Sequence, residues 1–253
     1  MSRPKVGFFD FTCCEGCQIE LTNYGDAAFL ELLNHIDIVE FREAMSEKAD
    51  KLDIAFIEGS FTREADRARL QEIRDRATVV IAYGACAATG GVNAMKNDTS
   101  DYKQEVYGAD ANMPHLASNQ ALPVSAAIKV DYSVLGCPMD KYELLDIVSH
   151  LLHGKIPVGP NYPVCVECKR NETVCRYDLG DHCIGQVARA GCGAPCPADG
   201  IPCEACRGFV ANPNEASLKK VLIENGNLPE RWAERKSKLF AANHRNDAKK
   251  LGE

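Results

Sequence analysis

The sequence predicts an α/β protein in which a mostly parallel sheet is followed by a loop-rich C-terminal domain. Two observations lead to this prediction. Short apolar runs alternate with longer amphipathic segments through the first 160 of the 253 residues, a pattern typical of a parallel sheet covered by helices. Beyond that point the alternation stops, and eight of the 13 cysteines fall between residues 165 and 206. We therefore expect two domains, residues 1–160 and residues 161–253, with a boundary near Gly159 and Pro160.

Five short apolar runs predict the strands of the sheet. In chain order they are Val6–Phe9, Ile36–Phe41, Asp53–Ile57, Thr78–Ala82 and Tyr132–Leu135. Apolar residues at helical spacing predict helices over Gly25–Asn34, Arg63–Arg76 and Met139–Leu152. We also expect the segment after Gly208 to be helical.

Four cysteines follow predicted strands. Cys14 and Cys17 come after the first strand, Cys86 after the fourth and Cys137 after the fifth. In open parallel sheets, ligands gather beyond the carboxyl ends of the strands, so three separate loops could bring these thiols to one site. Glycine lies within two residues of Cys17, Cys86 and Cys137 and permits tight backbone turns beside a bulky ligand.

The other dense group of thiols lies in the C-terminal domain. Its members are Cys165, Cys168, Cys175, Cys183, Cys192, Cys196, Cys203 and Cys206. They divide into two sets of four, and four thiolates are what a 4Fe-4S cluster requires. Two zinc sites are the main alternative, because the first two and the last two of these cysteines each resemble half of a zinc ribbon. The additional four thiols spread over the sheet favour iron, since structural zinc domains use paired knuckles.

Composition and charge exclude several functional classes. The formal net charge of −7 and the spread of basic residues argue against nucleic-acid binding. The sequence contains no run of about 18 apolar residues, so we expect no direct membrane insertion. The N-terminus lacks the features of a signal peptide, so we expect a cytoplasmic protein. Disulfides rarely persist there, and the cysteines are therefore interpreted as metal ligands.

A flavodoxin-like sheet could instead hold a flavin, whose phosphate usually lies in a hydroxyl-rich and glycine-rich first loop. Here that loop is Thr12-Cys13-Cys14-Glu15-Gly16-Cys17, and thiols are poor phosphate donors but good iron ligands. The glycine-rich segment Gly84–Gly91 lacks the Lys-Ser/Thr ending of a P-loop, and no G-x-G-x-x-G motif opens a helix. We therefore expect no nucleotide site in this chain.

The motifs resemble those of the small subunit of NiFe hydrogenases, a family related to the 20 kDa subunit of respiratory complex I. The resemblance extends to about Gly208 and rests on Cys14-Glu15-Gly16-Cys17, Gly84-Ala85-Cys86-Ala87, Gly136-Cys137-Pro138 and Tyr162-Pro163-Val164-Cys165. It implies a flavodoxin-like parallel sheet with a C-terminal, loop-rich iron-sulfur domain. Together with the missing export signal, it makes the chain look like a cytosolic enzyme subunit, near the sulfhydrogenase delta subunits and the bidirectional or electron-bifurcating types.

The resemblance also implies three 4Fe-4S clusters, a proximal one in the sheet domain and a medial and a distal one in the C-terminal domain. The implied ligands are Cys14, Cys17, Cys86 and Cys137 for the proximal cluster, Cys192, Cys196, Cys203 and Cys206 for the medial cluster, and Cys165, Cys168, Cys175 and Cys183 for the distal cluster. Many relatives have histidine in place of Cys165, and periplasmic uptake enzymes have proline in place of Cys196 and hold a 3Fe-4S cluster. All-cysteine ligation lowers reduction potentials, which suits exchange with hydrogen, ferredoxin or nicotinamide.

The function implied by the resemblance is electron transfer for a hydrogenase. The nickel-iron centre that cleaves hydrogen would lie in a separate large subunit, not in this chain, and no residue here would be catalytic. A flavin/iron-sulfur diaphorase or a ferredoxin-linked subunit would pass the electrons to NAD(P) or ferredoxin. Two rival functions are a complex I-like quinone-reducing connector, which needs only the proximal cluster, and a stand-alone iron-sulfur carrier, which needs no second domain.

Four further residues stand beside the implied ligands. Cys13 lies outside the family pattern, and we expect it to pack as a small apolar residue. Glu15 and Glu58 could relay protons, although capping or exposed carboxylates are commoner. His182 adjoins Cys183 and is expected to be a neighbour of the ligands or exposed, not a ligand itself.

Overall fold

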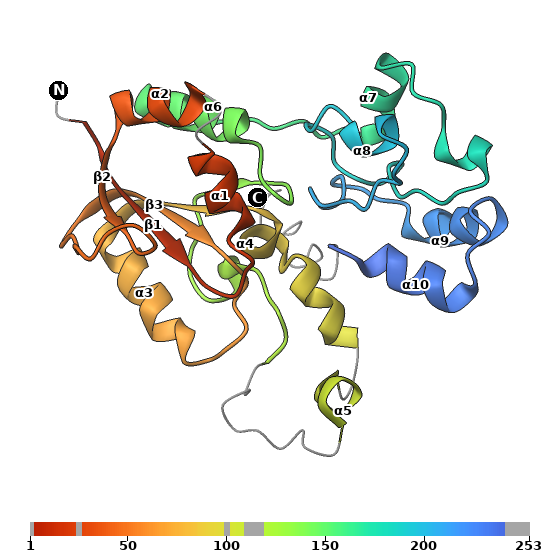
Figure 1. Ribbon diagram of the computed structural model, residues 1–253, viewed down its shortest axis with the longest axis horizontal. Helices are drawn as coiled ribbons and strands as arrows, with labels where there is room; N and C mark the ends of the chain where they lie inside the picture. Colours follow the sequence, from red (N-terminus) through yellow and green to blue (C-terminus); the bar gives the residue numbers. More distant parts are fainter. Residues whose placement is uncertain (1–2, 24–26, 99–101, 109–118, 241–253) are drawn as a thin grey trace. The chain divides into compact units, whose positions relative to one another are not determined.

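The computed structural model describes residues 3–23, 27–98, 102–108 and 119–240. The chain folds into two compact units, Met1–Leu145 and Asp146–Glu253, referred to as the first and the second unit. Figure 1 traces the elements of both units. Among the described helices, none combines the length and the hydropathy that a membrane span requires.

The first unit contains a five-stranded parallel sheet with the strand order β2-β1-β3-β4-β5. The strands are β1 Lys5–Asp10, β2 Asp37–Phe41, β3 Leu52–Glu58, β4 Ala77–Tyr83 and β5 Tyr132–Val134. This order is the flavodoxin-like one, and the predicted fold class is confirmed. After β2 the chain crosses to the other side of β1, so the order reverses between β1 and β3.

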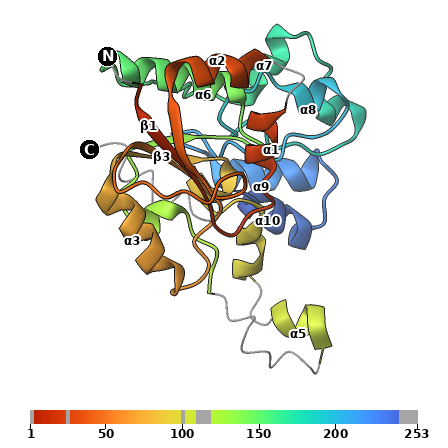
Figure 2. The ribbon, with the colours of Figure 1, turned by 60° about the vertical axis from the view of Figure 1, so that its left-hand side comes forward.

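Short helices and 3-10 turns connect the strands of the first unit. Among the described residues they are α1 Gly16–Thr22, α2 Ala27–His35, α3 Asp66–Arg76, α4 Ala85–Thr89, η1 Val92–Asp98, α5 Tyr102–Tyr107 and η4 Val124–Ala126. Figures 1 and 2 show α2 and α3 on opposite faces of the sheet. The helix predicted from Gly25 is α2, and residues 24–26 lie outside the described part of the chain.

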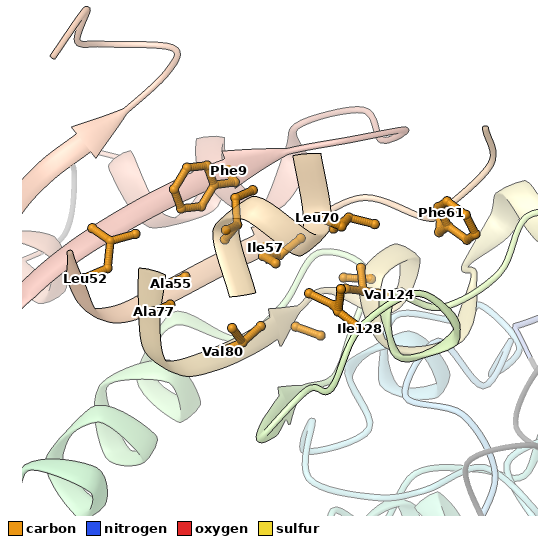
Figure 3. Packing of buried hydrophobic residues seen from close by; sticks show 13 residues of the cluster. Phe9, Leu52, Ala55, Ile57, Phe61, Leu70, Ala77, Val80, Val124 and Ile128 are labelled. Atoms are coloured by element: carbon orange, nitrogen blue, oxygen red, sulfur yellow. The ribbon is translucent and has the colours of Figure 1, made fainter. Parts of the chain in front are cut away.

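The three central strands, β1, β3 and β4, are buried on both faces along most of their length, which explains why they appear in the sequence as continuous apolar runs. On the face that α3 covers, Leu70 of that helix packs with Ile57 of β3 and Val80 of β4 in one apolar cluster (Figure 3). On the opposite face Phe8 stacks on Phe56, with ring centroids 5.0 Å apart. Both rings are fully buried. The core therefore fixes the strand ends from which the loops with the predicted ligands begin.

The second unit consists of short helices joined by loops. After α6 Lys141–Leu152, which begins in the first unit, it contains α7 Val164–Arg170, η5 Arg176–Leu179, α8 Pro195–Ala198, α9 Glu215–Glu224 and α10 Glu230–Lys238. Its small core includes Val164 of α7 and Leu218 and Leu222 of α9. Two buried cysteines, Cys183 and Cys203, belong to the same cluster. Metal ligation in this unit would therefore coincide with its apolar core.

Candidate metal centres

The loop after β1 is fixed to the loop that follows β3. The Phe11 N–H donates to the Glu58 carbonyl at 2.9 Å, and the Ser60 N–H donates to the Thr12 carbonyl at 2.9 Å. The Asn93 side chain on η1 also donates to the Thr12 carbonyl, at 2.9 Å. Two segments that are distant in sequence, the end of β3 with its loop and η1, thus hold the backbone directly before the first predicted ligands.

The start of α1 depends on a buried carboxylate from β3. Glu15 precedes this helix with a φ of 60° and supplies no side-chain cap. The Glu58 carboxylate instead accepts the N–H groups of Cys17 and Gln18, each at 3.2 Å. Helix N-termini favour such an acceptor because their first N–H groups have no partner within the helix. Glu58 is 2% exposed, so it acts here as a buried cap that positions Cys17.

Cys86 and Cys137 follow the neighbouring strands β4 and β5. The Ala85 N–H donates to the Gly136 carbonyl at 2.7 Å and ties together the two loops that carry these cysteines. The turn at Gly136 has a φ of 126°, which favours glycine. The carboxyl ends of β4 and β5 thus present two predicted ligands from adjacent loops.

Two glycines lie directly against predicted ligand sulfurs. A Cβ atom at Gly84 would overlap the Cys17 sulfur, and one at Gly91 would lie 2.7 Å from the Cys86 sulfur. Both glycines also have positive φ angles, 83° and 60°. The backbone around the thiols is therefore compact enough that no other residue fits at these two positions without a shift.

Electrostatic effects show that the thiols of the first unit are neighbours. The pKa of Cys86 is raised to about 12, mainly by burial and next by Cys137. Burial raises the pKa of Cys137, and Cys14 is the next cause. Burial raises the pKa of Cys17 as well, followed by Glu58. Four thiolates in this place require a compensating cation, and the donor set fits an iron-sulfur cluster.

Cys13 lies at the same end of the sheet. Its thiol is partly buried and donates to the Phe11 carbonyl at 3.5 Å. Its pKa is raised to about 12, first by burial and then by Glu58. Cys13 also contributes to the raised pKa of Cys86. Five thiols therefore gather here, and the family pattern predicts four of them as ligands.

In the second unit, the predicted distal ligands lie on and after α7. Cys165 and Cys168 lie on this helix, Cys175 precedes η5, and Cys183 follows η5. The pKa of Cys165 is raised to about 11, mainly by burial and then by Cys183, Cys168 and Cys175. The structure thus brings all four predicted distal ligands together.

The predicted medial ligands lie around α8. Burial raises the pKa of Cys192, and a smaller contribution comes from Cys196 on α8. Burial also raises the pKa of Cys203, with smaller contributions from Cys183 of the distal set and then from Cys206 and Cys192. These four thiols form a second group, which fits another cluster.

The two groups of the second unit adjoin each other. The Cys203 N–H donates to the Cys183 sulfur at 3.3 Å. His182 contacts Asp181 through Nδ1 at 3.0 Å and lies 4.0 Å from Glu204, so its ring faces carboxylates, as expected for a neighbour of the ligands. Glu204 also pairs with Lys236 of α10. The last helix is thereby attached next to predicted medial ligands.

Sequence reasoning missed the side chains that hold these loops. Asn93 is one of them, and Glu167 on α7 is another, because its carboxylate accepts the Gly191 N–H at 2.7 Å. Asn93 lies outside the ligand motifs, and Glu167 occupies a non-ligand position between Cys165 and Cys168. The sequence did contain a signal for Glu167. Its carboxylate lies between two predicted ligands, whose thiols must face a common site.

The comparisons with known proteins agree with this geometry. The family model described as NADH ubiquinone oxidoreductase, 20 Kd subunit, matches residues 14–151. This chain belongs to that family. The matched residues include all four predicted proximal ligands of this chain and end before the cysteines of the second unit.

Curated relatives cover nearly the whole chain. It is 35% identical over 239 residues to sulfhydrogenase 2 subunit delta of Pyrococcus furiosus, covering 94% of this chain and 99% of that protein. It is 32% identical to a subunit of the F420-non-reducing hydrogenase vhu of Methanocaldococcus jannaschii, covering 92% and 98% of the two chains. The predicted resemblance of this chain to hydrogenase small subunits is therefore confirmed.

A solved structure supports the fold. The [NiFeSe] hydrogenase of Desulfovibrio vulgaris Hildenborough aligns with a TM-score of 0.57 and 21% identity, covering 82% of this chain and 94% of that chain. At this identity the likeness concerns the fold alone. The chain therefore shares its fold with that solved structure.

Proposed function

We propose that this chain is the electron-transfer small subunit of a NiFe hydrogenase, an oxidoreductase that interconverts H2 with two protons and two electrons. Its role is to carry electrons between the nickel-iron centre of a large subunit and a soluble acceptor or donor module. The observation that carries the proposal is the grouping of twelve thiols around one site in the first unit and two adjoining sites in the second. The two curated relatives reported above, both hydrogenase subunits, support it further.

The proposed cofactors are three 4Fe-4S clusters, which would supply one-electron redox chemistry when bound. Cys14, Cys17, Cys86 and Cys137 would hold the proximal cluster, Cys192, Cys196, Cys203 and Cys206 the medial one, and Cys165, Cys168, Cys175 and Cys183 the distal one. The chain contributes thiolates, exclusion of water and N–H groups directed at the ligands. The buried positions of Cys17, Cys183 and Cys203 are consistent with this role.

The proposed partner is a large subunit that holds the nickel-iron centre. Glu58, a carboxylate next to the first site, accepts two backbone N–H groups, so we assign it a positioning role and no acid or base role in the reaction of H2. A flavin/iron-sulfur diaphorase or a ferredoxin-linked subunit is the proposed module at the other end, with NAD(P) or ferredoxin as the acceptor.

A complex I-like connector is the second candidate, and the description of the matching family favours it. Such a connector needs only the proximal cluster. The family match ends at residue 151, whereas eight cysteines follow it and group around two further sites. These eight thiols favour the hydrogenase subunit.

Metal and sulfide analysis of the natively purified, anaerobically handled complex tests the proposal. Three clusters predict about twelve iron atoms and as many sulfides per copy of this chain, in addition to iron in the partner. Nickel should be present in the same complex. Iron without nickel would favour the connector or a stand-alone carrier, and zinc alone would exclude electron transfer through these thiols.

A further inference from the structure

Glu167 links the helix of one predicted cluster to the loop of another. It lies on α7 between Cys165 and Cys168, two predicted distal ligands. Its Oε1 accepts the Gly191 N–H at 2.7 Å, and its Oε2 accepts the Gly193 N–H at 3.1 Å. The residue between these two N–H groups is Cys192, a predicted medial ligand. One carboxylate thus binds the backbone on both sides of a ligand that belongs to the neighbouring set.

Other contacts hold the same segment to α7. Asn171, directly after this helix, donates from its side chain to the Gly193 carbonyl at 2.7 Å. The Cys192 sulfur lies 3.8 Å from the Glu167 Oε2 atom. The Glu167 charge is therefore close to Cys192 in space and to Cys168 along the chain.

The environment of Cys192 is charged on its other side as well. The Arg207 side chain is 3% exposed and donates from Nε to the Ala190 carbonyl at 2.9 Å. A Cβ atom at Gly191 would lie 2.7 Å from an Arg207 nitrogen, so guanidinium and backbone are in close contact. The segment with Cys192 thus contacts both a carboxylate and a buried guanidinium.

We propose that Glu167 is a positioning residue shared by two metal sites: its two N–H contacts fix Cys192 relative to α7, and its negative charge acts on both clusters. This inference rests on the proposed function, since it requires clusters at both sites. Groups that hydrogen-bond next to ligands orient them and tune the metal, and nearby net charge shifts the reduction potential of iron-sulfur clusters. A negative charge stabilises the oxidised state, so Glu167 keeps both potentials low.

The charge is tested with Glu167→Gln in the purified complex with its partner subunits. Glutamine has the same shape and retains one oxygen that accepts an N–H group, but it carries no charge. In redox titrations followed by EPR, we expect the medial and distal potentials to rise while the proximal potential does not move. The control is Glu172→Gln, which removes an exposed carboxylate shortly after the same helix and should leave all potentials unchanged.

The positioning role is tested with Glu167→Asp, which keeps the charge but shortens the side chain by one methylene. Both N–H contacts then lengthen, and the loop with Cys192 loses its attachment. We expect the medial cluster, to which Cys192 is assigned, to lose its iron faster than in the wild type when an iron chelator is added. The other two clusters should be retained. Asn171→Ala should produce a smaller effect of the same kind.

Three results would overturn the inference. They are unchanged medial and distal potentials in Glu167→Gln, a shift in only one of the two, and an equal shift in Glu172→Gln. Iron analysis of the wild type separates this failure from failure of the proposed function. If the wild-type chain lacks iron at the eight C-terminal cysteines, the ligand assignment itself is wrong, whereas normal iron content with unmoved potentials contradicts only the role of Glu167.

Discussion

Gly84 has a φ of 83° and lies against the Cys17 sulfur, so it meets two separate demands at the first site. With a ψ of 158°, this backbone conformation is one that essentially only glycine adopts, and it would disfavour other residues by about 1–3 kcal/mol. The close approach adds a steric demand, because the turn that carries Cys86 passes directly over a ligand from another loop. At the scale of single residues, the site therefore depends on the lack of a side chain at Gly84 as well as on the thiols.

Replacing Gly84 with Ala should displace Cys17 and abolish binding of the proximal cluster. The expected result is a loss of about four iron atoms per chain, measured by iron analysis, with the other two EPR signals retained. Gly154→Ala is the matched control, since Gly154 has a φ of 65° but nothing within 4 Å of its added Cβ. Full iron content in Gly84→Ala would contradict the assignment of Cys17.

Replacing Cys196 with Pro should convert the medial cluster from 4Fe-4S to 3Fe-4S. Cys196 lies in the first turn of α8, after Pro195, where a residue without an N–H group is tolerated. Removal of one thiolate should raise the potential of this cluster and leave the other two intact. EPR detects the 3Fe-4S signal in the oxidised protein, and an unchanged spectrum would remove Cys196 from the ligands.

At the scale of elements, α1 is a short helix whose first N–H groups find their acceptor on a different strand. Glu58 ends β3 and accepts two of them. Burial raises the pKa of this carboxyl, and the N–H groups of Cys17 and Gln18 counteract that effect. The arrangement couples the position of a ligand helix to the central strand of the sheet.

Replacing Glu58 with Ala should leave two buried N–H groups without an acceptor. Such a loss costs about 1–3 kcal/mol, which should appear as a lower thermal midpoint of the complex in calorimetry. Glu58→Gln keeps one accepting oxygen and should have a smaller effect. A midpoint in Glu58→Ala equal to that of the wild type would show that the carboxylate does not stabilise α1.

The elements that are buried on both faces could be predicted from the sequence. The elements that are held by single contacts could not. The five strands were predicted from short apolar runs. For a central strand such as β3, such a run is typical of burial on both faces of a sheet. The helix α1 was not predicted, and its first two residues were assigned to the first loop, since its N-terminus depends on Glu58, 41 residues away. The ligand motifs predicted which thiols group together, but not that Glu167 holds the loop of Cys192, because that contact spans 24 residues.

At the scale of the whole molecule, the two units have separate apolar cores and separate predicted sites. The core of the first unit includes Leu70 on α3, whereas that of the second includes Leu222 on α9, and both side chains are fully buried. The core of the second unit also contains two of its predicted ligands. We therefore expect loss of packing and loss of iron to occur together within each unit.

Replacing Leu70 with Ala should destabilise the first unit by about 2–5 kcal/mol through the cavity that remains. On heating, the proximal EPR signal should then disappear at a lower temperature than in the wild type. The matched variant Leu222→Ala should instead lower the temperature at which the medial and distal signals disappear. If either variant affects all three signals equally, the two cores do not stabilise their own sites.

The contact between Gly84 and the Cys17 sulfur also has a consequence for how such chains diverge. A lineage that keeps the thiol cannot accept a side chain at position 84, whereas a lineage that has lost the thiol retains only the backbone demand at that position. The two positions should therefore vary together among descendants of a common ancestor, and a larger residue at 84 would mark chains whose first site has fallen out of use.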